Sequence, residues 1–418
     1  MVMLEVEAAR ALILQGLQRN PAESVAVDVA SDQVLAADVI CAEDLPPFDN
    51  TAMDGYALPL GPRTAQAGEV FEVRGEQAAG DAARASDAAC EIMTGARIPD
   101  GLDAVVPVEQ IRVLEQDAAG RALRIEITAE VPLGQHIRRV GEDIRCGERA
   151  LPAGTRIGPQ QFLLLAGIGC ARVDIVRRPR LALFCTGREL VEAGAPLGSG
   201  EIRNSNGPYL SAAIAAAGAE LMRYAVLPDE PAPLRHSIGE AVDAGAQVIL
   251  STGAVSMGRY DFVPEVLREL GAELVFHKLR MRPGKPLLFA RLPGGQLYFG
   301  LPGNPASSAV GFRFLVCAAL RALLGLKPER PWRLPLLADA SKKSGFTQYQ
   351  KACVRIAEDG RIGVELLRGQ ESFKVRPLAE ANAWAALPAE AEVLPAGTHI
   401  DVHGLEHWGL QLSMETIA

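Results

Sequence analysis

The run Leu181-Ala182-Leu183-Phe184-Cys185 is short, wholly apolar and followed by a loop that contains Gly187. Two later runs, residues 247–250 (QVIL) and 297–300 (LYFG), have a similar character and are also stopped by glycine. Each run leads through a Gly-containing loop into an amphipathic stretch of helical length, and the last of these ends near Leu324. Such alternation predicts a mostly parallel α/β sheet whose strands are buried on both faces by helices. Ligands of these sheets bind outside the carboxyl ends of the strands, so the loops after the runs are the predicted binding region.

The rest of the chain has a different texture. Residues 45–146 are short strand-like runs broken by Gly and Pro, which is typical of a compact β-rich domain. A helix is expected to start at Pro159, followed by a strand over residues 173–176. After Pro331, turns at Ser344-Gly345 and Asp359-Gly360 separate strand-like runs and predict an all-β domain. We predict an elongated connector (1–44 and 147–176), an inserted β-rich domain (45–146), an α/β domain (177–330) and a C-terminal β-barrel-like domain (331–418).

Composition excludes several classes of protein. The 418 residues carry a net charge of −9, whereas nucleic-acid binding proteins need a dense basic face, so no nucleic-acid role is expected. The seven cysteines are scattered, odd in number and never spaced as CxxC, which argues against a disulfide framework and a structural zinc site and favours a reducing cytoplasm. Apolar runs such as residues 162–168 are far too short to span a bilayer, and the first twenty residues lack the features of a secretory signal. We therefore expect a cytoplasmic protein without a membrane segment.

One loop carries a specific signature. It is Pro46-Pro47-Phe48-Asp49-Asn50-Thr51-Ala52-Met53-Asp54-Gly55-Tyr56-Ala57. Asp54-Gly55 alone would be an ordinary turn. The whole string, however, closely resembles the signature of the molybdopterin molybdenumtransferases, the family that includes the C-terminal domain of gephyrin.

The resemblance covers nearly the whole chain, because further motifs follow in the family's order. In the inserted domain and at its junction these are Glu91-Ile92-Met93-Thr94-Gly95-Ala96 with residues 99–106, and Gly141-Glu142-Asp143-Ile144. In the α/β domain they are Thr186-Gly187-Arg188-Glu189-Leu190, Asn204-Ser205-Asn206, residues 251–258 (STGAVSMG), Arg282-Pro283-Gly284-Lys285-Pro286 and Gly300-Leu301-Pro302-Gly303-Asn304-Pro305. A glycine turn after a strand is common, but five such strings in one order are highly specific.

The residues themselves suit an anionic ligand. Residues 252–258 follow a strand and precede a helix, so their backbone N–H groups can form a nest for a phosphate. Asn304 and Pro305 are expected to be the N-cap and first residue of a helix. Arg280, Arg282 and Lys285 put three cations beside a Pro-Gly turn, a density suited to an oxyanion, although a solvated basic loop is the alternative.

Acidic residues occupy the same kind of loop. Each would more often be a solvated surface charge, but grouped at the strand ends they can hold Mg²⁺ with the help of water. The predicted metal ligands are Asp54, Glu189, Asp229 and Asp261. The resemblance implies that Asp54 and Glu189 are the essential pair, and Asp143 and Lys285 complete the predicted catalytic set.

The resemblance implies a substrate class and partners as well. The family inserts molybdate into adenylylated molybdopterin and releases AMP. The resemblance also implies a homodimer, in which Asp54 of one subunit would complete the site of the other. Transient partners would be a molybdopterin adenylyltransferase and molybdoenzyme apoproteins. The predicted molybdopterin-binding residues are Thr94, Gly187, Ser205, Asn206, Thr252, Gly253, Ser256, Arg280, Arg282, Lys285, Pro302, Gly303, Asn304 and Ser307.

This sequence also departs from the family pattern. Arg188 and Arg259 stand where acidic residues are usual, and Ala254 and Asn204 replace a glycine and a frequent aspartate. The two arginines make the pocket more electropositive, which favours phosphates but disfavours Mg²⁺. In the C-terminal domain, Lys374-Val375-Arg376-Pro377 replaces smaller, Ser-rich sequence. A non-catalytic paralogue that holds the pterin as a scaffold is therefore the alternative, and an adenylyltransferase is a weaker one.

Three histidines near the end recur at every fourth residue, at positions 399, 403 and 407. On a helix this spacing could form a metal face, but Gly397 and Gly404 predict strand and turn instead. We expect the three side chains to lie on the surface of a β domain.

Overall fold

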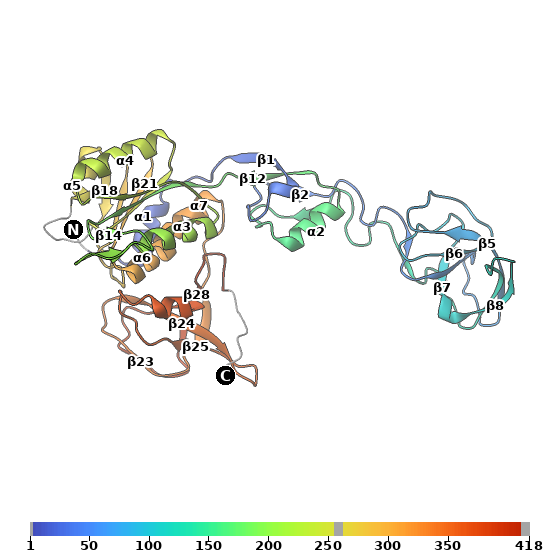
Figure 1. Ribbon diagram of the computed structural model, residues 1–418. Coiled ribbons are helices and arrows are strands. Elements are labelled where there is room, and N and C mark those ends of the chain that lie inside the picture. Colours follow the sequence, from blue (N-terminus) through green and yellow to red (C-terminus); the bar gives the residue numbers. More distant parts are fainter. Residues whose placement is uncertain (1–2, 255–261, 411–418) are drawn as a thin grey trace. The chain divides into compact units, whose positions relative to one another are not determined.

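The computed structural model describes residues 3–254 and 262–410, and it contains two compact units (Figure 1). Unit 1 comprises Met1–Glu23, Asp32–Ala36 and Ile175–Ala418, and unit 2 comprises Ser24–Ser31 and Ala37–Asp174. Unit 1 holds the α/β domain together with the C-terminal β domain. Unit 2 holds the strands of the inserted segment, and its predicted division from the connector at residues 45 and 146 stays a prediction.

The α/β domain is built on a six-stranded sheet. Its strands, in spatial order, are β16 (Glu220–Leu227), β13 (Arg180–Thr186), β17 (Val248–Thr252), β21 (Leu297–Leu301), β20 (Leu288–Arg291) and β18 (Glu273–Phe276). The first four strands are parallel, whereas β20 and β18 run antiparallel to their neighbours. The three predicted strands are therefore confirmed as β13, β17 and β21, and so is the mostly parallel sheet. The antiparallel edge was not predicted.

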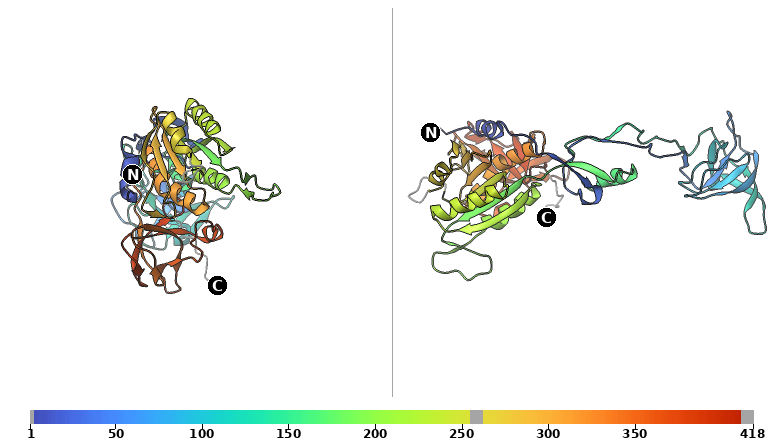
Figure 2. Two further views of the ribbon diagram at one scale, coloured as in Figure 1. Left: turned by 90° about the vertical axis from the view of Figure 1, so that its left-hand side faces the viewer. Right: turned by 90° about the horizontal axis from the view of Figure 1, so that it is seen from above.

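Helices cover both faces of this sheet, which explains why its central strands are continuously apolar (Figure 2). Successive side chains of β13 point to opposite faces, so Leu183 and Phe184 belong to different cores. Leu183 packs in one core with α1 (Val6–Leu14), α3 (Asn206–Ala216) and the helix from Pro305 to Leu323. Phe184 packs in the other core with α4 (Pro231–Asp243) and α5 (Val263–Glu269).

The helix from Pro305 to Leu323 consists of α6 (Pro305–Gly311), a π-helical turn η3 (Phe312–Val316) and α7 (Cys317–Leu323). Asn304 is its N-cap residue and Pro305 its first residue, as predicted, although the Asn304 side chain makes no capping bond. Among the described residues it is the one helix long and apolar enough to cross a membrane, but 83% of its most apolar window is buried in the fold. It is therefore placed as a core helix of the α/β domain.

The C-terminal part of unit 1 is a second sheet. Its strands, in order, are β19 (Met281–Arg282), β24 (Thr347–Ile356), β26 (Ala383–Leu387), β28 (His399–Gly404) and β22 (Trp332–Pro335), with β25 (Ile362–Leu366) paired to β24. The predicted turn at Asp359-Gly360 joins β24 to β25. One short helix, α8 (Arg376–Glu380), interrupts the otherwise β structure. Because β19 belongs to the α/β domain by sequence, this parallel pair with β24 joins the two domains of unit 1.

Unit 2 contains its own six-stranded sheet. Its order is β7 (Ala104–Pro107), β4 (Gly55–Leu58), β6 (Ala89–Ile92), β5 (Val70–Gln77), β9 (Ala122–Ile127) and β8 (Ile111–Gln116). The predicted helix is confirmed as α2 (Pro159–Gly167), and the strand after it as β12 (Arg172–Val176). At the start of β4 only glycine fits, because a Cβ on Gly55 would lie 2.0 Å from the backbone oxygen of Val106.

Candidate functional site

The carboxyl ends of three parallel strands are joined into one rim. Cys185 pairs with Thr252, and Thr252 pairs with Leu301, so β13, β17 and β21 end at the same level. The Thr186 hydroxyl donates to the Thr252 carbonyl at 3.1 Å, and the Gly253 N–H donates to the Leu301 carbonyl at 3.2 Å. We call this edge the sheet rim, made of residues 186–189, 252–254 and 302–307 with Ser205 and Asn206.

Close approach of two loops makes Gly253 necessary in the sheet rim. Its φ is +90°, a conformation that side chains disfavour. A Cβ at this position would lie 2.6 Å from the carbonyl oxygen of Thr186 and 2.7 Å from its hydroxyl. The glycine therefore allows the loops after β13 and β17 to touch.

We expect Gly253→Ala to lower the free energy of unfolding by about 2 kcal/mol, because the added methyl group forces the two loops apart. Urea unfolding followed by circular dichroism measures this change. Gly239→Ala is the matched control: Gly239 lies in α4 and a Cβ there would meet nothing within 4 Å, so this change should be neutral or slightly stabilising. Equal stability of the two variants would contradict the close approach at Gly253.

The start of α3 is attached to the loop after β21. The Asn206 side-chain N–H donates to the Gly303 carbonyl at 2.7 Å, which brings the predicted residues Ser205 and Asn206 to the rim. Asn206 Oδ1 is buried and has no hydrogen-bond partner in the described part of the chain. A buried acceptor without a donor costs about 1–3 kcal/mol, so this oxygen is suited to accept a hydrogen bond from a ligand.

Two predicted acidic residues of unit 1, Glu189 and Asp229, contact the backbone of the loop after β13. The Arg188 N–H donates to Asp229 Oδ2 at 3.1 Å, and Asp229 follows the neighbouring strand β16. The Glu189 carboxylate folds back over Gly187, where its two oxygens would be 2.9 Å from an added Cβ. The loop after β13 thus contacts Asp229 through its backbone, and a shared metal or catalytic role of Glu189 and Asp229 stays a prediction.

The basic loop at residues 280–285 lies beside the start of α6. A Cβ on Gly284 would be 3.4 Å from the Ser307 carbonyl oxygen. Arg282 and Lys285 both face the ring of Phe346, with the Arg282 guanidinium carbon 4.4 Å and the Lys285 Nζ 5.8 Å from its centroid. Arg280 differs, because its Nε lies 3.4 Å from a carboxylate oxygen of Glu5.

A loop of the C-terminal domain also reaches the rim, and sequence reasoning missed it. The Ala306 N–H, in the first turn of α6, donates to the Ser372 carbonyl at 3.0 Å. This loop is organised by Lys351, a 1% exposed residue of β24 whose Nζ donates to the carbonyls of Gly369, Glu371 and Lys374 at 2.8, 3.3 and 3.1 Å. Burial lowers the pKa of Lys351. A lysine between strand residues was the only local signal of this arrangement.

In unit 2 the predicted acid Asp54 is held by Thr94. The backbone N–H and the hydroxyl of Thr94 donate to Asp54 Oδ1 at 2.6 and 2.8 Å, and these bonds keep the pKa of Asp54 below its ordinary value. Since both bonds end on Oδ1, the other oxygen of the Asp54 carboxylate stays available to a ligand.

The predicted acid Asp143 is exposed on a different turn, where its backbone N–H donates to the Leu45 carbonyl. Asp54 belongs to unit 2 and Glu189 to unit 1, so their joint action stays a prediction.

Comparisons with known proteins agree with this layout. Residues 4–169 match the MoeA N-terminal region (domain I and II), residues 182–322 a probable molybdopterin binding domain, and residues 333–405 the MoeA C-terminal region (domain IV). The molybdopterin molybdenumtransferase of Synechococcus elongatus is 36% identical over 97% of this chain and 100% of the relative. The chain belongs to the molybdopterin molybdenumtransferase family.

Other members give the same result. The molybdopterin molybdenumtransferase of Haemophilus influenzae is 33% identical over 97% of this chain and 99% of the relative. The crystal structure of the molybdopterin biosynthesis moeA protein from Pyrococcus horikoshii OT3 matches with a TM-score of 0.79 at 26% identity, covering 96% of this chain and 99% of that one. The predicted family and multidomain fold class are thus confirmed.

Part of the family's predicted phosphate loop cannot be compared with the structure. The predicted ligands Ser256 and Asp261, and the unusual Arg259, lie outside the described residues. Thr252, Gly253 and Ala254 are described, and Ala254 has a φ of +49°. This is the position where the family usually has glycine, so the backbone keeps a glycine-like conformation despite the alanine.

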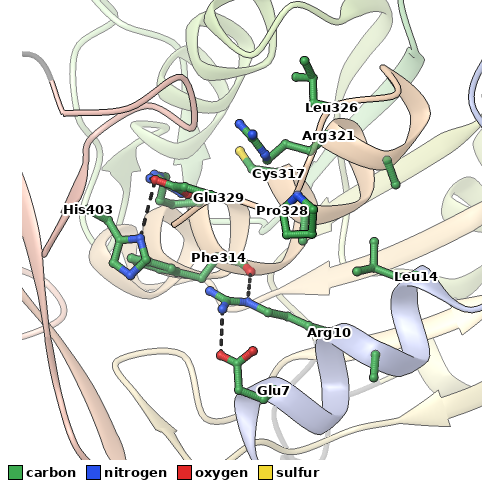
Figure 3. Close-up of a pocket in the computed structure, with 14 residues that line it drawn as sticks. Glu7, Arg10, Leu14, Phe314, Cys317, Arg321, Leu326, Pro328, Glu329 and His403 are labelled. Carbon is green, nitrogen blue, oxygen red and sulfur yellow. Dashed lines mark hydrogen bonds and ion pairs between the residues drawn. The ribbon is translucent and has the colours of Figure 1, made fainter. Parts of the chain in front are cut away.

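One pocket in unit 1 is lined by none of the predicted molybdenumtransferase residues. It measures about 480 Å³ and lies among α1, η3, α7 and His403 (Figure 3). Its charged groups are engaged with one another: Arg313 binds Glu329 through two bonds of 2.8 and 2.6 Å, and His403 Nδ1 lies 3.5 Å from the same carboxylate. We therefore assign these groups to the joint between the two domains of unit 1.

The histidine prediction was correct in its secondary structure and in the exposure of His399, and wrong in the location of His403 and His407. His399 and His403 lie on strand β28 and His407 lies in the turn that follows, and the described residues contain no cluster of three or more potential metal ligands. His403 and His407 are 7% and 1% exposed, however, and are not surface residues. His407 Nε2 lies 3.0 Å from the Ala217 carbonyl oxygen, and Trp408 Nε1 donates to the Ala216 carbonyl at 2.7 Å. Local sequence cannot reveal these contacts with the α/β domain.

Proposed function

We propose that this chain transfers molybdenum from molybdate to adenylylated molybdopterin and releases AMP. The observation that carries the proposal is the sheet rim itself, which lies in the segment matched by the molybdopterin-binding model and has Arg282 and Lys285 beside it. Relatives that match the full chain are named molybdopterin molybdenumtransferases. We further propose that the enzyme is cytoplasmic and homodimeric, with Asp54 of a second copy serving the same substrate, and that the family's adenylyltransferase and apoprotein partners bind transiently.

The two substrates are assigned to neighbouring parts of the rim. The pterin and its phosphates would contact the predicted binding residues on the loops after β13, β17 and β21, with Asn206 Oδ1 accepting a hydrogen bond from a pterin N–H. Molybdate is a dianion, so it would bind the cations of the basic loop, where the planar guanidinium of Arg282 can donate two parallel hydrogen bonds. Lys285 would supply a second charge.

The reaction releases one water molecule when molybdenum is inserted and consumes one when AMP is released. Two thiols of the dithiolene bind molybdenum, and their two protons leave with one oxo ligand as water. One water then hydrolyses the phosphoanhydride, so that AMP and the phosphate of the cofactor separate. A carboxylate is needed to orient or deprotonate this attacking water. Glu189 and Asp54 are the proposed groups, because Asp54 Oδ2 is not used by Thr94 and Glu189 is a half-buried residue on the loop after β13.

Magnesium often binds through one or two carboxylates and several waters, so it needs no cluster of three acids within one chain. Asp54, Glu189 and Asp229 would hold it, together with Asp261. When bound, Mg²⁺ would neutralise charge on the phosphates. The Arg188 N–H already donates to Asp229, so Asp229 keeps only part of its capacity for a metal.

The enzyme and scaffold hypotheses are separated by AMP release. We expect the purified chain to release AMP from adenylylated molybdopterin in the presence of molybdate and Mg²⁺, and to activate a molybdoenzyme apoprotein. Asp54→Asn should lower this rate by about 100-fold or more without changing pterin affinity. Tight pterin binding by the unaltered chain without AMP release would instead favour the scaffold.

A further inference from the structure

Phe346 lies where the C-terminal domain meets the basic loop. It immediately precedes β24, which pairs with β19 through Met281–Thr347 and Arg282–Gln348. The Thr347 N–H also donates to the Arg280 carbonyl at 3.0 Å. On the other side of Phe346 the Gly345 N–H donates to the Ala389 carbonyl at 2.9 Å, so the backbone is held both before and after the ring.

The ring attracts two cations at once. The Arg282 guanidinium carbon is 4.4 Å and the Lys285 Nζ 5.8 Å from the same ring centroid, and both distances are within the range of a cation–π interaction. Two cations near one another repel, and the negative face of the ring offsets part of that repulsion. The ring therefore holds the two charges together before any anion binds.

An aromatic partner differs from a carboxylate in one important way. Arg280 has the Glu5 carboxylate beside it, so its positive charge is partly neutralised. Within residues 3–254 and 262–410, neither Arg282 nor Lys285 has a carboxylate in ion-pair distance. The ring positions these two cations without cancelling their charge, and they keep it for a doubly negative ligand.

We propose that Phe346 is a positioning residue that presents Arg282 and Lys285 to the molybdate dianion and thereby determines the affinity for molybdate. This rests on the proposed function only for the identity of the anion. Phe346 does not touch the reacting atoms in this scheme. Its loss should therefore change molybdate saturation more than the maximal rate.

The test compares Phe346→Leu with Phe346→Trp in the full chain. Leucine removes the ring face and keeps an apolar side chain, whereas tryptophan keeps a ring face. We expect Phe346→Leu to raise the molybdate concentration for half-maximal AMP release about tenfold, with a maximal rate within about twofold of the unaltered chain. Phe346→Trp should stay close to the unaltered chain in both quantities. Trp332→Leu, which removes an exposed ring from β22 of the same sheet, is the matched control and should change neither.

Direct binding of molybdate, measured by calorimetry without the pterin, separates this proposal from the proposed function. Molybdate binding that weakens in Phe346→Leu but not in Phe346→Trp supports the role of the ring even if AMP release is never observed. Equal molybdate affinity of Phe346→Leu and the unaltered chain would overturn it. So would equal losses in the Leu and Trp variants, or an unaltered chain that does not bind molybdate. Thermal unfolding of each variant reports whether a loss reflects unfolding of the domain.

Discussion

Glu189→Gln is expected to reduce AMP release by at least about 100-fold while leaving the affinity for the pterin substrate within about twofold. Glutamine has nearly the same shape as glutamate, so the loop after β13 should keep its conformation over Gly187. The substitution removes the negative charge and the basic oxygen that would orient or deprotonate water. Single-turnover AMP release and pterin binding, measured separately, test these two statements.

A second acid in the same loop provides the control. Glu192 is exposed and lies three residues after Glu189. Glu192→Gln should leave AMP release within about twofold, because an exposed carboxylate that holds neither substrate nor water contributes little to the rate. If Glu189→Gln keeps full AMP production, Glu189 has no part in the mechanism.

The largest effect on stability is expected for Arg313→Met, which should lower the free energy of unfolding by about 3–5 kcal/mol. Arg313 is 3% exposed and makes two bonds to Glu329, and its Nε donates to the Gly404 carbonyl of the C-terminal sheet at 2.9 Å. Methionine fills a similar volume but leaves the Glu329 charge buried without its main partner. Chemical unfolding followed by circular dichroism measures the loss.

The control for this prediction is an exposed ion pair. Arg333 and Asp401 lie 3.0 Å apart on β22 and β28, with side chains 62% and 42% exposed. Arg333→Met should cost no more than about 1 kcal/mol, because water screens the pair and solvates the remaining charge. Similar losses for the two arginines would show that burial of the Arg313–Glu329 pair is not the cause.

The same pair predicts a dependence on pH. Burial alone would raise the pKa of Glu329, but hydrogen bonds from His403 and Arg313 and the charge of Arg313 lower it to about 2. A carboxyl with a lowered folded-state pKa stabilises the protein above its unfolded value of about 4.5, and this stabilisation is lost as the pH falls from there towards 2. Stability measured between pH 6 and 3 should fall less steeply in Arg313→Met than in the unaltered chain. A parallel decline in both proteins would contradict this assignment.

The candidate site was predictable to different extents in its different parts. The loops after β13, β17 and β21 could be located because each follows an apolar run and contains a family motif. That Asn206 would donate to Gly303, leaving its own oxygen unpartnered, depends on how α3 packs against the neighbouring loop. Phe346 could not be found from the sequence, since Arg282 and Lys285 are distant from it in the chain and only the pairing of β19 with β24 brings them together.

The sequence by itself determined the family, the strands of the α/β sheet and the start of the helix at Asn304-Pro305. Strands buried on both faces must be continuously apolar, and a proline at the first helical position needs no N–H, so both features leave local signals. Only the tertiary structure decided that Lys351 would be buried under a loop, that Arg313 would bind Glu329 beneath the C-terminal sheet, and that one aromatic ring would face two cations. These contacts depend on strand pairing and packing between distant segments, and no local pattern of residues encodes such geometry.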